Sequence, residues 1–214
     1  MFPLGDASRR LSSIPVVTVA LIAVNAAVFY LELTQGEPFI LRWSVVPAVI
    51  AQHERYETIV SAMFMHGGWM HIIGNMIFLW SFGPQIEGAM GPIRYLIFYL
   101  VGGVAAFAAQ IAADPTSTIP NLGASGAIAA VMGAFLVLFP RDQIRTLIFA
   151  GVFTRVVYLP AILLIGIWFL LQVLSVNMEQ APGEAASGGV AYLAHIGGAI
   201  FGAVTAKLFE RRGG

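Results

Sequence analysis

Four polar side chains stand inside stretches of this sequence that are otherwise apolar, and their types could support nucleophilic chemistry. They are a serine, two histidines and an asparagine: Ser125, His195, His71 and Asn75. A serine hydroxyl becomes a nucleophile when an imidazole takes its proton, and N–H donors stabilise the oxyanion that then forms. The chain contains no cysteine, which excludes a cysteine nucleophile, a disulfide framework and a thiolate metal site.

Ser125 lies between glycines at the start of an apolar run, in the segment Asn121-Leu122-Gly123-Ala124-Ser125-Gly126. Gly123 and Gly126 permit a tight transition from loop to helix and leave space around the hydroxyl. The first turn of a helix offers free N–H groups and a partial positive charge, which suits an acyl-transfer nucleophile. An N-cap serine flanked by flexible glycines is the alternative interpretation of this short segment.

His195 stands inside an apolar stretch, in the segment Ala194-His195-Ile196-Gly197-Gly198. An ionisable residue at membrane depth is costly, so function is the default interpretation, and a core histidine with satisfied hydrogen bonds is the alternative. No Asp or Glu stands within the core of an apolar stretch, so a third, orienting carboxylate is not expected. The sequence therefore predicts a Ser125–His195 dyad with His195 as general base.

His71 and Asn75 are four residues apart, so they project from the same face of a helix. With the backbone N–H of Ser125 and the space left by Gly123, they could form an oxyanion hole. Interhelical hydrogen bonds that only hold the bundle together are the alternative for Asn75. His66 lies off that face and is expected to order the loop. A metal site is not expected, because no His-Glu-x-x-His motif and no suitably spaced carboxylate accompanies the histidines.

The composition is that of a membrane protein. Hydrophobic residues make up 58% of the 214 residues and charged residues 10%, too few for the surface of an ordinary soluble domain. Eleven Lys and Arg balance eleven Asp and Glu without a basic patch, so a nucleic-acid partner is not expected. The lipid bilayer is the expected surrounding.

Five apolar stretches come close to the length of about 20 residues that a spanning helix needs. They are Ile14–Leu33, Ile93–Ala113, Leu122–Phe139, Leu159–Val176 and Val190–Phe209. A sixth stretch, Trp69–Ile86, is weaker because it carries His71 and Asn75. The sequence thus predicts an all-α membrane protein, a bundle of six transmembrane helices that forms a single domain over residues 1–214.

Basic residues predict the orientation of this bundle. Six spans place both termini on one side, and that side carries nine of the eleven basic residues: Arg9, Arg10, Arg94, Arg141, Arg145, Arg155, Lys207, Arg211 and Arg212. Because cytoplasmic loops are enriched in Lys and Arg, both termini are expected in the cytoplasm. The first loop, Thr34–Met65, then lies outside in the interface, and Thr146–Phe153 forms a short interfacial segment on the cytoplasmic side.

The helices that carry the polar residues all enter the membrane from the external side under this topology. At 1.5 Å of rise per residue, Ser125, Asn75 and His195 lie about 5, 9 and 8 Å below the first residues of their spans. Small residues at helical spacing would let the fourth and sixth helices approach closely: Ser125, Ala129 and Gly133 in one, and Ala194, Gly198 and Gly202 in the other. Ser125 and His195 can then meet, although generic packing is the alternative for either stripe.

These residues together resemble the motifs of the rhomboid family of intramembrane serine proteases. The likeness extends over essentially the whole chain and consists of His66-x4-His71-x3-Asn75, Gly123-Ala124-Ser125-Gly126 and Ala194-His195-x2-Gly198-x3-Gly202, in this order. It implies Ser125 as nucleophile and His195 as base. It also implies an oxyanion site from His71, Asn75 and the Ser125 amide, with support from His66, Gly126, Gly198 and Gly202.

The resemblance further implies a six-helix rhomboid-like bundle that cleaves membrane-anchored protein substrates near the outer ends of their transmembrane segments. It implies no cofactor, and lateral entry of the substrate beside the fifth span. Two positions depart from the family pattern. Many members carry a Trp-Arg pair in the first loop where this chain has Glu57-Thr58, and some carry a tyrosine under the base where this chain has Ala129. The anchoring of the loop and the rotamer of His195 are therefore open questions.

We expect a multi-pass protein of the bacterial cytoplasmic membrane with a site that opens to the external side. A catalytically silent rhomboid-like protein that binds transmembrane clients is the alternative function, and only an activity assay separates the two. A small transporter or channel is disfavoured, because the cores of the spans lack charged residues. The natural substrate and the oligomeric state are not predicted by the sequence.

Overall fold

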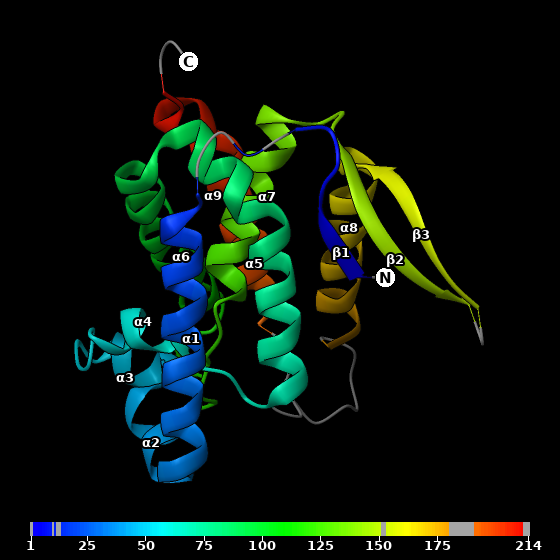
Figure 1. Cartoon of the computed structure of the whole chain (residues 1–214). Helices are drawn as coiled ribbons and strands as arrows, with labels where there is room; N and C mark the ends of the chain where they lie inside the picture. Colours follow the sequence, from blue (N-terminus) through cyan, green and yellow to red (C-terminus); the bar gives the residue numbers. More distant parts are fainter. Residues whose placement is uncertain (1, 10, 12–13, 151–152, 180–190, 212–214) are drawn as a thin grey trace.

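The computed structural model describes residues 2–9, 11, 14–150, 153–179 and 191–211. Within them, six long helices form a bundle (Figure 1): α1 (Val16–Gln35), α5 (Trp69–Met90), α6 (Pro92–Ala113), α7 (Ser125–Leu138), α8 (Ala161–Glu179) and α9 (Tyr192–Phe209). Short segments connect α1 to α5: α2 (Glu37–Trp43), α3 (Pro47–Ala51), α4 (Thr58–Ser61) and the 3₁₀ turn η1 (Ala62–Phe64). The long helices correspond to the six stretches that the sequence indicates, although the predicted start of the last one, Val190, lies outside the described residues.

α7 forms the core of the bundle. All residues from Gly126 to Phe135 are buried, because α5, α6, α8 and α9 pack around this helix. Its contact with α9 is made backbone to backbone: a Cβ on Gly202 would lie 1.9 Å from the carbonyl oxygen of Ala130, and a Cβ on Gly198 would lie 2.1 Å from that of Gly126. Only glycine fits at these two positions of α9. The predicted stripe of α9 therefore does meet α7. On α7 the contacts are made by Gly126, Ala130 and Gly133, so Ser125 and Ala129 of the predicted stripe are not the residues in these contacts.

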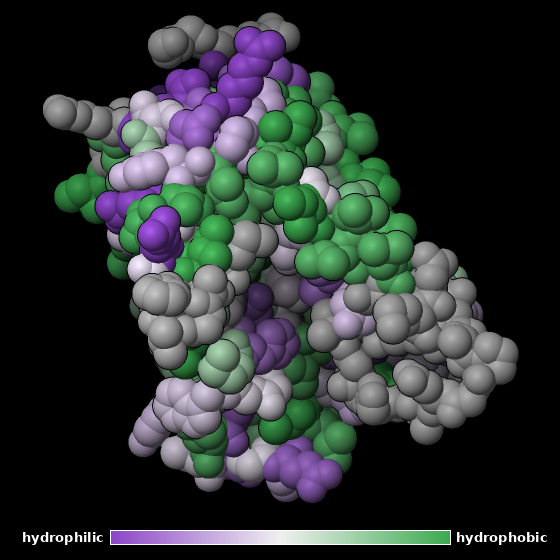
Figure 2. Space-filling model, turned by 90° about the vertical axis from the view of Figure 1, so that its right-hand side faces the viewer, coloured by the Kyte–Doolittle hydropathy of each residue, from purple (hydrophilic) through white to green (hydrophobic). Residues whose placement is uncertain are grey.

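The helices give the molecule its membrane-protein character. Among the described residues, α1, α6 and α9 are long and apolar enough to cross a bilayer. The 14 residues of α7 extend for only about 21 Å, less than the roughly 30 Å of a hydrocarbon core. Figure 2 shows a face on which hydrophobic side chains form a band, with hydrophilic side chains gathered at the end where the C terminus lies. The chain is thus a mostly helical membrane protein, while the six-span count and the orientation stay predictions.

The start of α1 and the end of α9 lie at the same end of the bundle. The buried carboxylate of Glu87, near the end of α5, accepts hydrogen bonds from the backbone N–H groups of Val17 and Thr18 at 2.9 and 2.8 Å. It thereby satisfies free amides at the positive end of the α1 dipole. Close by, the carbonyl of Ala89 accepts a hydrogen bond from the N–H of Arg211, just after α9. The predicted second helix ends at Ile86, one residue before Glu87, so the sequence did not indicate this cap.

A three-stranded antiparallel sheet stands beside the helices, so the prediction of an all-α protein is wrong. Its strands are β1 (Phe2–Asp6), β2 (Gln143–Ala150) and β3 (Phe153–Pro160), and β2 lies in the middle. β1 packs against α5, and the β2–β3 hairpin leads directly into α8 (Figure 1). The predicted interfacial segment Thr146–Phe153 is therefore part of a hairpin.

The residues of β2 alternate as a half-buried strand requires. Ile144 and Thr146 are buried, while Arg145 between them is exposed. This period of two, together with the β-branched Val156 and Val157 in β3, favours a strand over an interfacial helix. An isolated hairpin is only marginally stable, and the third strand comes from the far N-terminal end of the chain. The pairing of β1 with β2 joins segments far apart in the chain, so it cannot be recognised from the length and hydrophobicity of single stretches.

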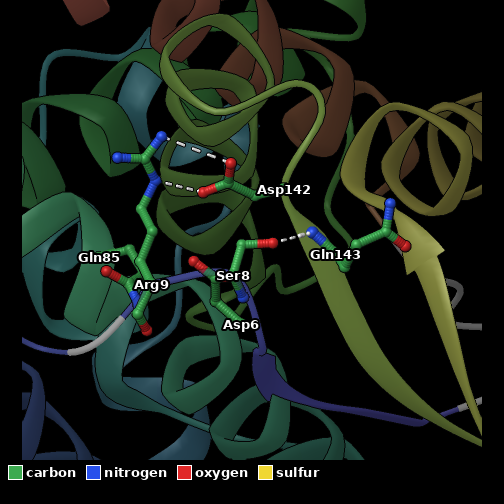
Figure 3. Close-up of polar contacts among 6 residues, drawn as sticks. All are labelled: Asp6, Ser8, Arg9, Gln85, Asp142 and Gln143. Atoms are coloured by element: carbon green, nitrogen blue, oxygen red, sulfur yellow. Dashed lines mark hydrogen bonds and ion pairs between the residues drawn. The ribbon is translucent and has the colours of Figure 1, made fainter.

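Polar contacts tie the segment after β1 to the loop before β2 (Figure 3). Arg9 forms an ion pair with Asp142, and the backbone N–H of Gln143 donates a hydrogen bond to the hydroxyl of Ser8 at 2.7 Å. The side-chain amide of Gln85 in α5 donates to the carbonyl of Arg9 at 3.3 Å. The N-terminal segment is thus fixed both to α5 and to the residues that precede α8.

Asp6 makes the stability of this cluster depend on pH. Burial raises the pKa of its carboxyl group and the nearby Asp142 raises it further, whereas the hydrogen bond from the Ser8 N–H and the charge of Arg9 lower it. A carboxyl group whose pKa is raised in the folded state reduces stability as the pH rises through that pKa, because the charged form is disfavoured. We therefore expect Asp6→Asn to raise the midpoint of thermal unfolding at about pH 8 and to change it little at about pH 4.

Thermal unfolding in detergent at the two pH values measures this effect. Asp114→Asn is the matched control, because the Asp114 side chain is exposed and also accepts a turn hydrogen bond, from the Thr116 N–H at 3.1 Å. At about pH 8 the gain of Asp6→Asn should exceed any gain of this control. An equal gain for Asp6→Asn at both pH values would contradict a role for ionisation of the carboxyl group.

Candidate active site

Ser125 is the first residue of α7, so the helix begins three residues later than the sequence predicts. Ala124 rather than Ser125 occupies the N-cap position, which argues against the alternative that this serine is only a cap. Gly123 has a φ of +134°, which favours glycine, and its N–H donates to the carbonyl of Ala62 at 2.9 Å. The first amides of α7 have no acceptor within their own helix, so free N–H groups lie next to the Ser125 hydroxyl.

The first loop holds the segment before Ser125 in place. Val45 and Asn121 exchange two backbone hydrogen bonds, at 2.9 and 2.7 Å, and the N–H of Ala48 donates to the carbonyl of Ser117 at 3.0 Å. These contacts join backbone to backbone. They therefore anchor the first loop, although this chain has Glu57-Thr58 where many family members have a Trp-Arg pair.

His195 lies in the first turn of α9, and its Nε2 atom is 2.7 Å from the Oγ atom of Ser125. The histidine is only 6% exposed, so this contact is shielded from bulk water. Gly198 and Gly202 follow on the same face of α9, and their backbone contacts with α7 hold the two helices at this separation. The structure thus brings together the two residues that the sequence predicts as nucleophile and base.

Two residues of α8 that the sequence analysis did not single out also contact the imidazole of His195. The Oε1 atom of Gln172 lies 2.7 Å from its Nδ1 atom. The ring of Trp168 lies 5.6 Å away, centroid to centroid, at an interplanar angle of 39°. Trp168 thus provides an aromatic ring against His195, a contact that Ala129 cannot provide at the position where some family members carry a tyrosine. The available signal was an aromatic and a polar side chain four residues apart in an otherwise aliphatic stretch, hence on one helix face.

His71 lies beside Ser125 on the α5 side. A Cβ on Gly123 would lie 3.0 Å from the Nε2 atom of His71 and 3.4 Å from the Oγ atom of Ser125, so glycine keeps this space free. The Gly67 N–H donates to the Nδ1 atom of His71 at 3.2 Å, which means that Nε2 carries the proton in the neutral ring. His71 therefore presents an N–H donor next to Ser125.

Asn75 is buried one helical turn after His71, and its Nδ2 group has no hydrogen-bond partner among the described residues. Buried donors without a partner are rare in folded proteins, and each one calls for an explanation. A donor reserved for a developing oxyanion is such an explanation. The alternative, that this amide holds the bundle together, would require a partner for Nδ2 on a neighbouring helix.

His66 contacts His71 rather than Ser125. The two imidazole rings lie 5.1 Å apart, centroid to centroid, in an edge-to-face arrangement. The backbone N–H of His66 donates to the buried carboxylate of Glu32 in α1 at 3.0 and 3.1 Å. Burial, together with the neighbouring His71, lowers the pKa of the His66 imidazole to about 3. The ring is therefore neutral and packs behind His71, in keeping with the supporting role expected from the sequence.

A small cavity lies beside the Ser125 hydroxyl. Its volume is about 10 Å³, close to the space of one water molecule, and its lining includes Met63, Gly123 and Ala194. A polypeptide cannot enter a cavity of this size. Binding of a peptide at Ser125 therefore requires neighbouring groups to move.

The site thus combines a hydroxyl, an imidazole at proton-transfer distance and N–H donors on a second side, the set needed for attack on a carbonyl group. The family model of the Rhomboid domain matches residues 53–212. The chain belongs to the rhomboid family. The matched region contains Ser125, His195, His71, Asn75 and Gln172, so the resemblance drawn from the sequence motifs is confirmed at the level of the family.

Relatives with rhomboid names match large parts of the chain. Rhomboid protein 1, mitochondrial, of Saccharomyces cerevisiae is 27% identical over 188 residues, which cover 86% of this chain and 50% of that protein. RHOMBOID-like protein 12, mitochondrial, of Arabidopsis thaliana is 29% identical over 205 residues, or 88% of this chain and 56% of that protein. Rhomboid protease GluP of Bacillus subtilis is 32% identical over 127 residues, or 57% and 24%. The chain thus spans about half the length of these rhomboid relatives, or less.

These relatives bear on the predicted location. Two carry mitochondrial names and one comes from a bacterium. The prediction of a membrane protein is confirmed by the rhomboid domain and the apolar helices. The comparisons do not support a bacterial cytoplasmic membrane in particular, so the kind of membrane stays a prediction.

Proposed function

We propose that this rhomboid protein is an intramembrane serine endopeptidase that cleaves transmembrane segments of membrane-anchored proteins. The observation that carries the proposal is the 2.7 Å contact between the Oγ atom of Ser125 and the Nε2 atom of His195. A hydroxyl and an imidazole at this distance can exchange a proton directly. The family membership supports the proposal, and one relative is itself named a rhomboid protease.

The proposed reaction has two halves. The Ser125 oxygen attacks the carbonyl carbon of the scissile peptide while its proton passes to Nε2 of His195, and N–H donors of Ser125, His71 and Asn75 hold the oxyanion. The imidazolium then gives the proton to the leaving amine, the C–N bond breaks and an acyl-enzyme remains. His195 next takes a proton from water, whose oxygen attacks the ester, and the serine returns with release of the carboxyl product.

The proposed topology is a single rhomboid-type domain over residues 1–214 with six spans and cytoplasmic termini. It is supported by the distribution of charge: Arg94, Lys207 and Arg211 lie at the end of the bundle where α1 starts and α9 ends. Ser125 and His195 lie in the first turns of their helices at the opposite end, near the first loop. The site would then open to the external side of the membrane.

A fluorophosphonate probe tests the proposed activity in the detergent-solubilised protein. We expect one covalent adduct, located by mass spectrometry on the peptide that contains Ser125, because the probe reacts with activated serine hydroxyls. Cleavage of a reporter transmembrane segment should fall in proportion to the labelled fraction, and the heat-unfolded protein is the control that should not react. The alternative, a silent rhomboid-like protein that binds clients, predicts reporter binding without adduct or cleavage, and that result would overturn the proposal.

A further inference from the structure

We infer that Gln172 is the positioning residue of the general base, because its side-chain oxygen fixes the tautomer and the orientation of His195. The inference rests on the proposed function and adds a third member to a pair that lacks a carboxylate. It also assigns a role to α8, a helix that contributes neither the nucleophile nor the base of the proposed reaction. The contact that carries it is the 2.7 Å approach of Gln172 Oε1 to His195 Nδ1.

The environment of Gln172 determines which end of its amide faces the histidine. The Nε2 group lies 3.4 Å from the backbone carbonyl oxygen of Trp168, one turn earlier in α8. A carbonyl oxygen can only accept, so the amide nitrogen must face Trp168 and the amide oxygen must face His195. Because that oxygen can also only accept, the proton of the neutral imidazole resides on Nδ1.

This tautomer is the one that a general base requires. With the proton on Nδ1, the Nε2 atom of His195 directs its lone pair at the Ser125 hydroxyl. When Nε2 takes the serine proton, the ring becomes positive and its Nδ1–H bond to the Gln172 oxygen strengthens. A neutral amide has the same task in proteases with a Cys-His-Asn set, so a carboxylate is not essential for it.

The other neighbours of the ring do not replace Gln172 in this task. Trp168 and Tyr192 contact the imidazole through their aromatic rings, at centroid distances of 5.6 and 6.3 Å. His71 is an ionisable neighbour close enough to act on His195 electrostatically. In the part of the chain that the structure describes, no Asp or Glu contacts the ring. The orientation of the base therefore depends on one uncharged side chain of α8.

Two substitutions at Gln172 separate positioning from packing. Gln172→Met keeps the length of the side chain and removes the acceptor, whereas Gln172→Glu keeps an acceptor oxygen at the same place. Gln110→Met is the matched control, since Gln110 is also half-buried and its Oε1 atom accepts from the backbone N–H of Ala194, next to the base but not on its ring. The control should cleave at the rate of the unmodified protein.

We expect Gln172→Met to lower kcat about 10- to 100-fold, the effect of one lost hydrogen bond to a charged ring, with KM nearly unchanged. The rate of fluorophosphonate labelling should fall by the same factor, because labelling needs the base but no transmembrane substrate. Gln172→Glu should recover most of the loss. In spectra of ¹⁵N-labelled histidine, the His195 ring of the unmodified protein should show Nδ1 protonated, and the same ring in Gln172→Met should show the Nε2 tautomer as well.

Three results would each overturn this inference while the unmodified protein cleaves its reporter. They are an unchanged kcat in Gln172→Met, equal losses in the Met and Glu variants, and an unchanged histidine tautomer. If Gln172→Met also lowers the midpoint of thermal unfolding, positioning can still be told from packing, because the Glu variant and the spectra are independent readouts. Absence of labelling and cleavage in the unmodified protein would instead refute the proposed function.

Discussion

We expect cleavage of a reporter transmembrane substrate to disappear in Ser125→Ala, with kcat lowered on the order of 10³-fold or more, while the fold persists. The substitution removes the Oγ atom that is the nucleophile of the proposed reaction. His195 keeps its contact with Gln172, so the base stays in place. The loss of one hydroxyl and its hydrogen bond changes the free energy of unfolding by about 1 kcal/mol. Reporter cleavage and thermal unfolding, both in detergent, measure the two effects.

Ser81→Ala is the matched control for this experiment. Ser81 is a buried serine of α5 whose hydroxyl donates to the carbonyls of Pro3 and Ile77 at 2.9 and 2.7 Å, away from the site. Its replacement should lower stability by a similar amount and leave cleavage unchanged. Wild-type cleavage by Ser125→Ala would show that the nucleophile lies elsewhere.

Gly202→Ala gives the largest expected loss of stability, about 3 kcal/mol or more. The added Cβ would lie 1.9 Å from the carbonyl oxygen of Ala130 and 2.6 Å from its carbonyl carbon. Both are backbone atoms of the buried helix α7, so no side-chain rotation relieves the clash and α9 must move away. For a chain of this size the midpoint of thermal unfolding should fall by roughly 6 to 12 °C. Cleavage should fall as well, because Ser125 and His195 stand on these two helices.

Gly166→Ala is the corresponding control within a helix. An added Cβ at Gly166 in α8 meets no atom within 4 Å, so only the higher helix propensity of alanine acts there. We expect a gain of up to about 1 kcal/mol. Equal effects of the two substitutions would refute the close contact between α7 and α9.

The meeting of Ser125 and His195, the proposed nucleophile and base, could be predicted from the sequence because each is a polar residue in an apolar stretch. The packing that brings the Ser125 and His195 side chains together could be predicted only in part. The predicted fourth helix starts at Leu122, whereas α7 starts at Ser125 and places the hydroxyl in its first turn. The contact is fixed instead by Gly198 and Gly202, whose stripe was visible in the sequence.

The sheet and the α8 side of the site could not be predicted in the same way. β2 is short and apolar, and its pairing partner lies at the N terminus, so a search for helices of spanning length passes over both. Gln172 carries no charge, so it does not stand out as His195 does. Its role depends on the packing of α8 against α9, which no spacing within one helix reveals.

The sheet has a mechanical consequence for α8. It ends where α8 begins, and there the N–H groups of Ala161 and Ile162 donate to the carbonyls of Asp142 and Pro140 at 2.8 and 3.1 Å. Gln172 lies eleven residues further, roughly 16 Å along the axis, so a tilt of about 10° around this fulcrum would carry it by roughly 3 Å. The fixed end would hardly shift, and α7 and α9 would keep their backbone contacts at Gly198 and Gly202. Such a tilt would therefore free the imidazole of His195 from Gln172 without separating the two helices that carry Ser125 and His195.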